Sequence, residues 1–232
     1  MRLWSSIGLA LVSGCAGVSG CAGESAEIGP VCPEAMVLVT DASGGAAFCI
    51  DAYEGGVVDR KGLGNSDQGP DWPDGSTTTT LTSRAGAVPS INISWYQAAA
   101  MCLNAGKHLC TVEEWSDACD GQVGEGGTTY SWGDAWKEGA CHTTGPSAPD
   151  SLQPAGSLES CVSRFGAFDL VGNAWEWADP GTLHEGVPVA SKIGGAFYTG
   201  GRHYACGSTP NTRHPPEFDG TIAARCCAEP AR

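Results

Sequence analysis

Twelve cysteines among 232 residues constrain the fold of this chain more than any other feature. Arg2 precedes a mostly apolar run, residues 3–12, which is too short and too rich in small residues to span a membrane and is typical of an export signal. Exported domains fold in oxidising compartments, so most of these cysteines are predicted to form disulfides. There is no CxxC pair, and the five histidines show neither HxH nor HxxxH spacing, so no imidazole-based metal centre is predicted.

The leader ends in one of two places. Val-Ser-Gly-Cys occurs twice, ending at Cys15 and at Cys21, and it resembles the lipobox of bacterial lipoproteins, in which the cysteine becomes the lipidated first residue. Cleavage before Cys21 leaves ten other cysteines, an even number, whereas cleavage before Cys15 would leave an odd thiol. We therefore predict a signal peptide over 1–20, lipidation at Cys21 with Cys15 as the alternative, and a tether over 21–31. The predicted location is the bacterial cell envelope, as a periplasmic or surface lipoprotein, with plain secretion as the alternative.

Charge and composition restrict the partners. The formal charge is −14 with only 12 Lys and Arg, and no basic run exists, so no nucleic-acid partner is predicted. Membrane contact is expected only through the lipid anchor. Thirty-four glycines and 14 prolines indicate many turns and little helix, and no composition break divides residues 32–228, so we expect one domain and a monomer.

The clearest local signals are one β unit and two helices. Short apolar runs on either side of a Ser-Gly-Gly turn predict two strands within 31–54. Ser94 with Gln97, and Thr111 with Glu114, have the spacing of capping boxes, and each precedes apolar residues at helical spacing. We therefore predict a helix after Ser94 and a second after Thr111.

The segment DLVGNAWEW, residues 169–177, is the strongest candidate for a site. In an extended backbone Trp175 and Trp177 lie on one face and Glu176 on the other. Side-chain oxygens of Asn173, Glu176 and their neighbours, with carbonyls of the glycine turn, suit calcium, which takes about six to eight oxygens. The alternative is a turn that its tryptophans anchor in the core.

Several segments together resemble the formylglycine-generating enzyme, or sulfatase-modifying factor, family. The resemblance covers residues 32–228, in family order. It is carried by MVLV…FCIDAYE (36–54), INISWYQAAAMCLNAGKHLCTVEEW (91–115), YSWGD (130–134), DLVGNAWEW (169–177), IGGAFY (193–198) and AARCC (223–227). It implies an α+β, C-type-lectin-like fold with two helices on short twisted antiparallel sheets, much irregular structure and many disulfides.

The resemblance implies an activity whose residues are missing here. Family enzymes oxidise a sulfatase cysteine to formylglycine with oxygen, using two cysteines that bind copper, and thiolates suit that soft ion. Here the position of the first cysteine holds Thr199, and the second falls near His203 or Tyr204. Copper is therefore not expected. Cys206, the only sulfur in the region, is the one remaining candidate for a catalytic residue, and the resemblance instead implies that it is bonded to Cys119.

The resemblance also implies disulfides and a calcium site. The family's second bridge corresponds to Cys102–Cys226, and the remaining six cysteines can pair as Cys32–Cys49, Cys110–Cys227 and Cys141–Cys161. For calcium, the matching ligands are carbonyls of Val171, Gly172 and Ala174 and the carboxylate of Glu176, with Asn173 nearby. A second calcium site of the family needs an asparagine where this chain has His142.

We accordingly predict a non-catalytic binding module for a peptide or glycan. Its groove is expected between the loops 55–85 and 194–220, with Tyr198, Arg202, His203 and Tyr204 as contact residues, unless these form an ordinary surface loop. The first alternative is a metal-dependent oxidase with a rearranged centre at Cys206. The second is a structural protein of the envelope.

Overall fold

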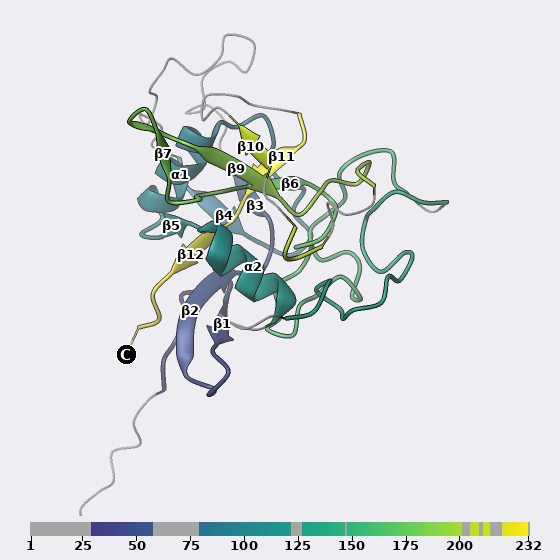
Figure 1. The fold of residues 1–232 in the computed structure, drawn as a ribbon, viewed down its shortest axis with the longest axis horizontal. Coiled ribbons are helices and arrows are strands. Elements are labelled where there is room, and N and C mark those ends of the chain that lie inside the picture. The colour runs from purple at the N-terminus through teal and green to yellow at the C-terminus, as the bar shows by residue number, and fades with distance from the viewer. Residues whose placement is uncertain are drawn as a thin grey trace, which may run out of the picture.

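Two four-stranded sheets, two two-stranded sheets and two helices form the regular part of the described fold (Figure 1). The structure is a computed structural model, and it describes residues 29–57, 79–121, 127–146, 148–200, 205–208, 211–213 and 220–231. Arg202, His203 and Tyr204 lie outside these residues, as does the whole predicted leader with Cys15 and Cys21. No helix among the described residues has the length and apolar character needed to cross a bilayer.

The first sheet contains the predicted opening β unit. Its strand order is β1-β2-β12-β5, and every pairing is antiparallel. The bounds are Met36–Thr40 for β1, Ala46–Asp51 for β2, Cys226–Ala228 for β12 and His108–Leu109 for β5. Between β1 and β2 the Asp41 carboxylate accepts hydrogen bonds from the Ser43 and Gly45 backbone N–H groups, which closes the turn.

The second sheet is mixed, which differs from the antiparallel sheets expected. Its order is β10-β9-β6-β11, and β11 pairs with β6 in parallel. The bounds are Asn211–Arg213 for β10, Ala190–Ile193 for β9, Trp175–Ala178 for β6 and Ile222–Ala224 for β11. A parallel neighbour requires a long connection, and here β9, β10 and the segments around them separate β6 from β11. Two hairpins complete the strands: β3 (Gly55–Val57) with β4 (Leu81–Ser83), and β7 (Leu183–His184) with β8 (Val187–Pro188).

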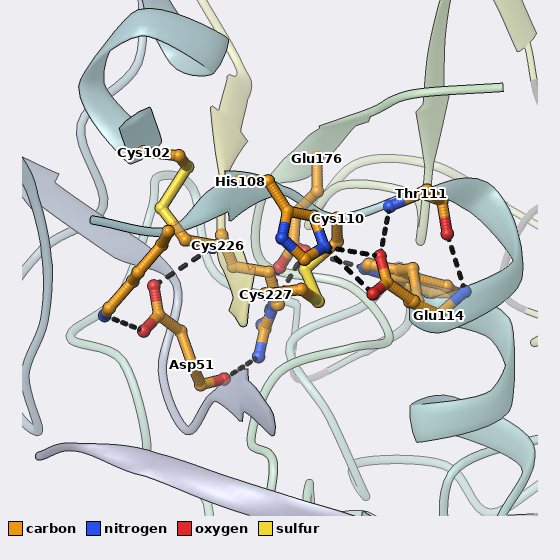
Figure 2. Close-up of a disulfide and its surroundings, with 12 residues drawn as sticks. Asp51, Cys102, His108, Cys110, Thr111, Glu114, Glu176, Cys226 and Cys227 are labelled. Carbon is orange, nitrogen blue, oxygen red and sulfur yellow. Dashed lines mark hydrogen bonds and ion pairs between the residues drawn. A yellow bond between two sulfur atoms is a disulfide. The ribbon is translucent and has the colours of Figure 1, made fainter. Parts of the chain in front are cut away.

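Both helices begin at the predicted capping boxes. Helix α1 spans Trp95–Asn104 and α2 spans Val112–Asp120. In each box the cap hydroxyl accepts from the backbone N–H three residues on, and the Gln97 or Glu114 side chain accepts from the cap's own N–H. Glu114 also lies 2.9 Å from Nε2 of His108 on β5, so one carboxylate serves both the cap and an ion pair (Figure 2).

Five disulfides join the described segments, and they are the five predicted pairs. The family itself supplies Cys102–Cys226 and Cys119–Cys206, and the pairing predicted for the remaining six cysteines, Cys32–Cys49, Cys110–Cys227 and Cys141–Cys161, is also found. The adjacent Cys226 and Cys227 point to opposite sides of β12, so one is bonded to α1 and the other to the segment just before α2 (Figure 2). Disulfides of this number are typical of an oxidising compartment outside the cytoplasm.

Two apolar clusters flank β6. One surrounds Trp115 of α2 and the inner faces of β1 and β2, and the other surrounds α1 with Trp175 and Trp177. The segment between α2 and β6 runs as long irregular loops to one side of the sheets, on the right of Figure 1. The sharp turn of DLVGNAWEW therefore lies between the two clusters, where its polar groups are buried.

Candidate functional site

Strand β6 places Glu176 as the sequence predicts. Trp175 and Trp177 belong to the α1 cluster, and the indole N–H of Trp177 donates to the carbonyl of Ile93 at 2.8 Å. Glu176 lies on the opposite face and is 1% exposed. The alternation of side chains along an extended strand separates a charged group from its aromatic neighbours.

The Glu176 carboxylate is fully occupied by protein donors. Its Oε2 accepts from Nε of Arg225 at 2.7 Å and from the indole N–H of Trp115 at 2.7 Å. Its Oε1 accepts from Nη2 of Arg225 at 2.6 Å. The guanidinium and the carboxylate thus form a bidentate ion pair, with neither side chain exposed by more than 1%.

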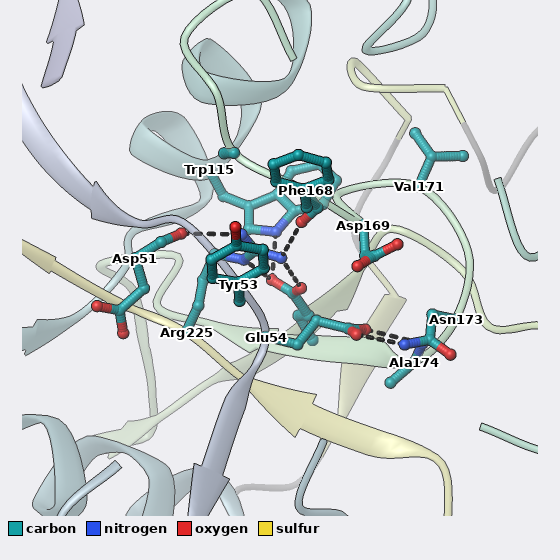
Figure 3. Close-up of polar contacts among 12 residues, drawn as sticks. Asp51, Tyr53, Glu54, Trp115, Phe168, Asp169, Val171, Asn173, Ala174 and Arg225 are labelled. Carbon is teal, nitrogen blue, oxygen red and sulfur yellow. Dashed lines mark hydrogen bonds and ion pairs between the residues drawn. The ribbon is translucent and has the colours of Figure 1, made fainter. Parts of the chain in front are cut away.

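Two further carboxylates lie near the same guanidinium (Figure 3). Glu54, at the end of the opening β unit, accepts hydrogen bonds from the Asn173 side-chain amide and the Ala174 backbone N–H. Asp169 accepts from the Gly156 backbone N–H at 2.6 Å through one oxygen, and its buried Oδ1 has no hydrogen-bond partner among the described residues. One cation therefore faces three buried acids.

The pKa values of these acids reflect this imbalance. Burial raises the pKa of Glu54 well above its ordinary value, and the charges of Asp169 and Glu176 raise it further. Burial also raises the pKa of Asp169 to about 6, although the Gly156 N–H and the charge of Arg225 oppose the shift. Burial alone would lower the pKa of Arg225, but the carboxylates of Glu176, Glu54 and Asp169 together outweigh it. The cluster favours one permanent cation and keeps protons on Glu54 and Asp169 to higher pH than water would.

The predicted calcium ligands lie together in this turn, but their side chains are turned to protein partners. Gly172 and Asn173 both have positive φ, 82° and 53°, which makes the sharp bend before β6. The side-chain oxygen of Asn173 accepts from the Gln153 backbone N–H, and its carbonyl accepts from the Phe197 N–H. Glu176 is paired with Arg225. No group of three acidic, histidine or cysteine side chains placed to hold a metal occurs in the described ranges.

This geometry argues against Glu176 as a calcium ligand, since a guanidinium already neutralises it. The carbonyls of Val171, Gly172 and Ala174 alone supply fewer than the roughly six oxygens that calcium takes. At the position of the family's second calcium site, His142 Nε2 lies 2.8 Å from the Ser157 hydroxyl, and burial lowers the pKa of the imidazole. A neutral imidazole is suited to this hydrogen bond, whereas calcium, a hard cation, prefers oxygen ligands.

Residues 194–199, which lead to the position of the family's first copper-binding cysteine, form a tight turn that a threonine hydroxyl group stabilises. Gly194 and Gly195 have φ of 89° and 76°, and the Thr199 hydroxyl accepts from the Ala196 N–H at 2.9 Å. A Cβ on Gly194 would meet the Leu170 carbonyl and the Trp115 ring at 3.0 Å, so glycine is required there. The remaining candidate, Cys206, is bonded to Cys119 at the end of α2. The described residues therefore contain no free thiol.

The predicted ligand groove is only partly represented. Of the four contact residues, Tyr198 is described: it is 50% exposed, and its hydroxyl lies 2.9 Å from that of Thr221. A cavity of about 950 Å³ lies beside β3 and β4, next to the described ends of the loop 55–85. Tyr53, Arg84, Lys107 and Glu34 are among its lining residues, and none comes from 194–220. Among the described residues, Tyr198 is therefore not one of those that line this cavity.

Sequence reasoning missed the residues that organise the turn. Arg225 and Glu54 are 0% exposed and come from opposite ends of the domain. One signal could have found Arg225, because a charged residue between Ala-Ala and Cys-Cys in an apolar run must be paired if that run is buried. Nothing local identifies its partner.

The fold and this buried cluster define a disulfide-rich domain of the C-type-lectin-like, formylglycine-generating-enzyme-like class. A family model described as the sulfatase-modifying factor enzyme 1-like domain matches residues 40–220. The chain belongs to this family.

The curated relatives carry names from the same family, and these names describe both inactive and active proteins. The chain is 33% identical over 97 residues to the inactive C-alpha-formylglycine-generating enzyme 2 of Bos taurus, covering 38% of this chain and 32% of that protein. It is 30% identical over 168 residues to the formylglycine-generating enzyme of Mycobacterium tuberculosis, covering 63% of this chain and 48% of that protein. The matches thus span a third to a half of the length of these relatives.

Solved structures resemble the fold over most of its length. Treponema denticola variable protein 1 gives a TM-score of 0.55 at 16% identity, covering 88% of this chain and 94% of that one. PvdO from Pseudomonas aeruginosa gives 0.52 at 18% identity, covering 84% and 90%. At such identities the likeness concerns the fold alone.

Proposed function

We propose that this protein is an exported, lipid-anchored member of the family that acts as a non-catalytic binding module for a peptide or glycan. The observation that carries the proposal is the state of its sulfur. All ten cysteines between Cys32 and Cys227 are in disulfides, including Cys206, and a threonine stands at the position of the first copper-binding cysteine. A thiolate site for copper cannot be built from these residues.

Two further observations support a binding role. The name of the bovine relative calls that protein inactive, so the family includes a member without the activity. The cavity beside β3 and β4, at about 950 Å³, is within the range of about 300–1,000 Å³ that ligand sites occupy. Its lining combines the Tyr53 ring with the charges of Arg84, Lys107 and Glu34, which suits a ligand with both polar and apolar parts.

The rival function is an oxidase with a rearranged metal centre, and a thiol count separates the two. The full chain is unfolded in guanidinium without reductant and titrated with a thiol reagent, and mass spectrometry locates any thiol. We expect none at Cys206, and no stoichiometric binding of copper(I) to the folded protein. Cys119→Ser is the positive control, because it frees the Cys206 sulfur and must register as one thiol. A free Cys206 in the unaltered protein, or one copper per chain, would refute the non-catalytic function.

The lipid anchor is tested separately by incorporation of labelled palmitate in a bacterial host. We expect label in the natural chain and in Cys15→Ser, and none in Cys21→Ser. Loss of label in Cys15→Ser alone would move the lipidated residue to Cys15. Absence of label from all three would leave plain secretion.

A further inference from the structure

Three aromatic rings form a cluster in the irregular segment between α2 and β6. Tyr130 and Trp132 are stacked, with ring centroids 5.1 Å apart and planes within 6°. Trp136 contacts both edge-on, at 5.4 Å from Tyr130 and 5.9 Å from Trp132. Tyr130 and Trp132 pack against the core, whereas Trp136 is 44% exposed. The exposed indole therefore rests on two rings that the core holds in place. We call these three residues the aromatic platform.

The loop that carries the aromatic platform is fixed at several points. Tyr130 and Gly133 exchange two backbone hydrogen bonds in a tight turn, and the Asp134 carboxylate accepts from the Thr129 N–H at 2.9 Å. Thr129 in turn accepts through its carbonyl from the N–H of Cys206, which is itself bonded to α2 by a disulfide. The Trp132 indole N–H donates to the Ala135 carbonyl at 3.1 Å. An exposed ring that is already ordered loses little conformational entropy when a ligand stacks on it.

A single exposed tryptophan is ordinary and needs no explanation. Trp136 differs because it makes T-shaped contacts with two ordered rings, so that its exposed surface is held in place in a loop rich in polar side chains. Asp134, Lys137 and Glu138 in the same loop are exposed. Carboxylates accept hydrogen bonds from hydroxyl groups, and the ammonium donates to hydroxyl and carbonyl oxygens. An apolar surface surrounded by such groups suits a ligand whose flat face is apolar and whose edge is polar.

We propose that the aromatic platform binds a neutral glycan, with a pyranose ring stacked on Trp136 and its hydroxyl groups bonded to the neighbouring charged side chains. A sugar ring presents C–H groups of slight positive charge, which the negative face of an indole attracts. This inference rests on the proposed binding role and adds a second contact surface, because the aromatic platform is not among the residues that line the cavity beside β3 and β4.

Charge and backbone geometry decide between this ligand and others. At a formal charge of −14 the protein repels sulfated or carboxylated polysaccharides, so the glycan is neutral. An extended peptide is commonly bound along a free strand edge. Here Tyr130 and Gly133 pair with each other across the turn, so this turn presents no strand edge to a peptide. A proline-rich peptide can use aromatic side chains without an edge, and it is therefore the rival that the experiment includes.

The test is calorimetric titration of the full chain with maltohexaose, cellohexaose and chitohexaose, and with a heparin hexasaccharide and a decaproline peptide as rivals. We expect at least one neutral hexasaccharide to bind, and Trp136→Ala to weaken that binding about tenfold or more, as for a tryptophan at the centre of a contact. Trp136→Phe keeps a ring and should retain part of the affinity. Leu183→Ala is the matched control, since it removes another exposed apolar side chain, 68% exposed on β7, and should change the affinity less than about twofold.

Several outcomes would overturn the inference. They are no binding of the three neutral hexasaccharides at millimolar concentration, tighter binding of heparin or decaproline, or loss of binding in Leu183→Ala but not in Trp136→Ala. Near-ultraviolet circular dichroism of each variant shows that the fold is kept. Failure here with a thiol count of zero would leave the non-catalytic function standing, whereas a free thiol at Cys206 would refute that function even if a glycan binds.

Discussion

Removing the guanidinium of Arg225 is the sharpest perturbation of this fold. Arg225→Met keeps a long apolar side chain in the same space and deletes the cation that the described residues place among three buried acids. The guanidinium donates two hydrogen bonds to Glu176, one to the Asp51 carbonyl and one to the Phe168 carbonyl. All four are lost together.

The cost follows from these contacts. Leaving the Glu176 charge buried without its partner costs about 3–5 kcal/mol, as for one-sided removal of a buried ion pair. Each carbonyl that loses its donor costs about 1–3 kcal/mol more while it stays buried. We therefore expect a loss of about 5 kcal/mol or more, which is comparable to the whole stability of a typical domain. Arg225→Lys should lose less, because it keeps the charge but not the bidentate geometry.

The effect should depend on pH. The charge of Arg225 lowers the pKa of both Glu54 and Asp169, so in the variant these carboxyls hold protons in the folded state to higher pH. A folded state that binds more protons than the unfolded state gains stability as pH falls. The difference from the natural protein should thus be smaller at about pH 5 than at about pH 8.

Denaturant unfolding, followed by tryptophan fluorescence at both pH values with the disulfides intact, measures these quantities. Arg164→Met is the control, because Arg164 donates to one neutral carbonyl, that of Gly121, and its loss should cost about 1 kcal/mol. A loss below about 1 kcal/mol in Arg225→Met at the higher pH, or an equal loss at both pH values, would refute the reasoning.

Two further predictions concern pH and metal. The hydrogen bond that His108 donates to the Glu114 carboxylate raises the pKa of His108. Burial alone would raise the pKa of Glu114, but the hydrogen bonds from His108 and Thr111 outweigh it and lower this pKa. This pair stabilises the fold only while His108 is charged and Glu114 ionised. His108→Gln should therefore cost at most about 1 kcal/mol, chiefly between about pH 5 and 6.5, and the cost should vanish as pH rises further. A cost that is constant from pH 5 to about 9 would contradict the ion pair. For calcium, we expect the thermal midpoint to be the same with and without chelator, because Arg225 already occupies Glu176. A stabilisation of about 2.7 kcal/mol at a calcium concentration a hundred times its dissociation constant would show instead that an ion is bound.

Local signals in the sequence predicted the parts of the fold that local physics determines. A capping box needs only residues three apart, so Ser94 with Gln97 identified the start of α1 without knowledge of the rest of the chain. Alternation along an extended strand placed Glu176 opposite its two tryptophans. The family resemblance supplied what no local signal contains, namely the pairing of cysteines as far apart as Cys102 and Cys226.

What the sequence by itself determined is therefore the helix starts, the opening strands, the oxidising compartment and the missing copper-binding cysteine. Tertiary structure alone decided that the carboxylate of Glu176, predicted as a calcium ligand, is neutralised by Arg225, which lies 49 residues away. It also decided that Glu54 joins the same cluster, although Glu54 lies 119 residues before Asn173. It also made β11 parallel to β6, and it placed Trp136 on two ordered rings. The physical reason is the same in each case: propensity and capping act over a few residues, whereas charge pairing and ring contacts depend on distances in space that the packed core sets.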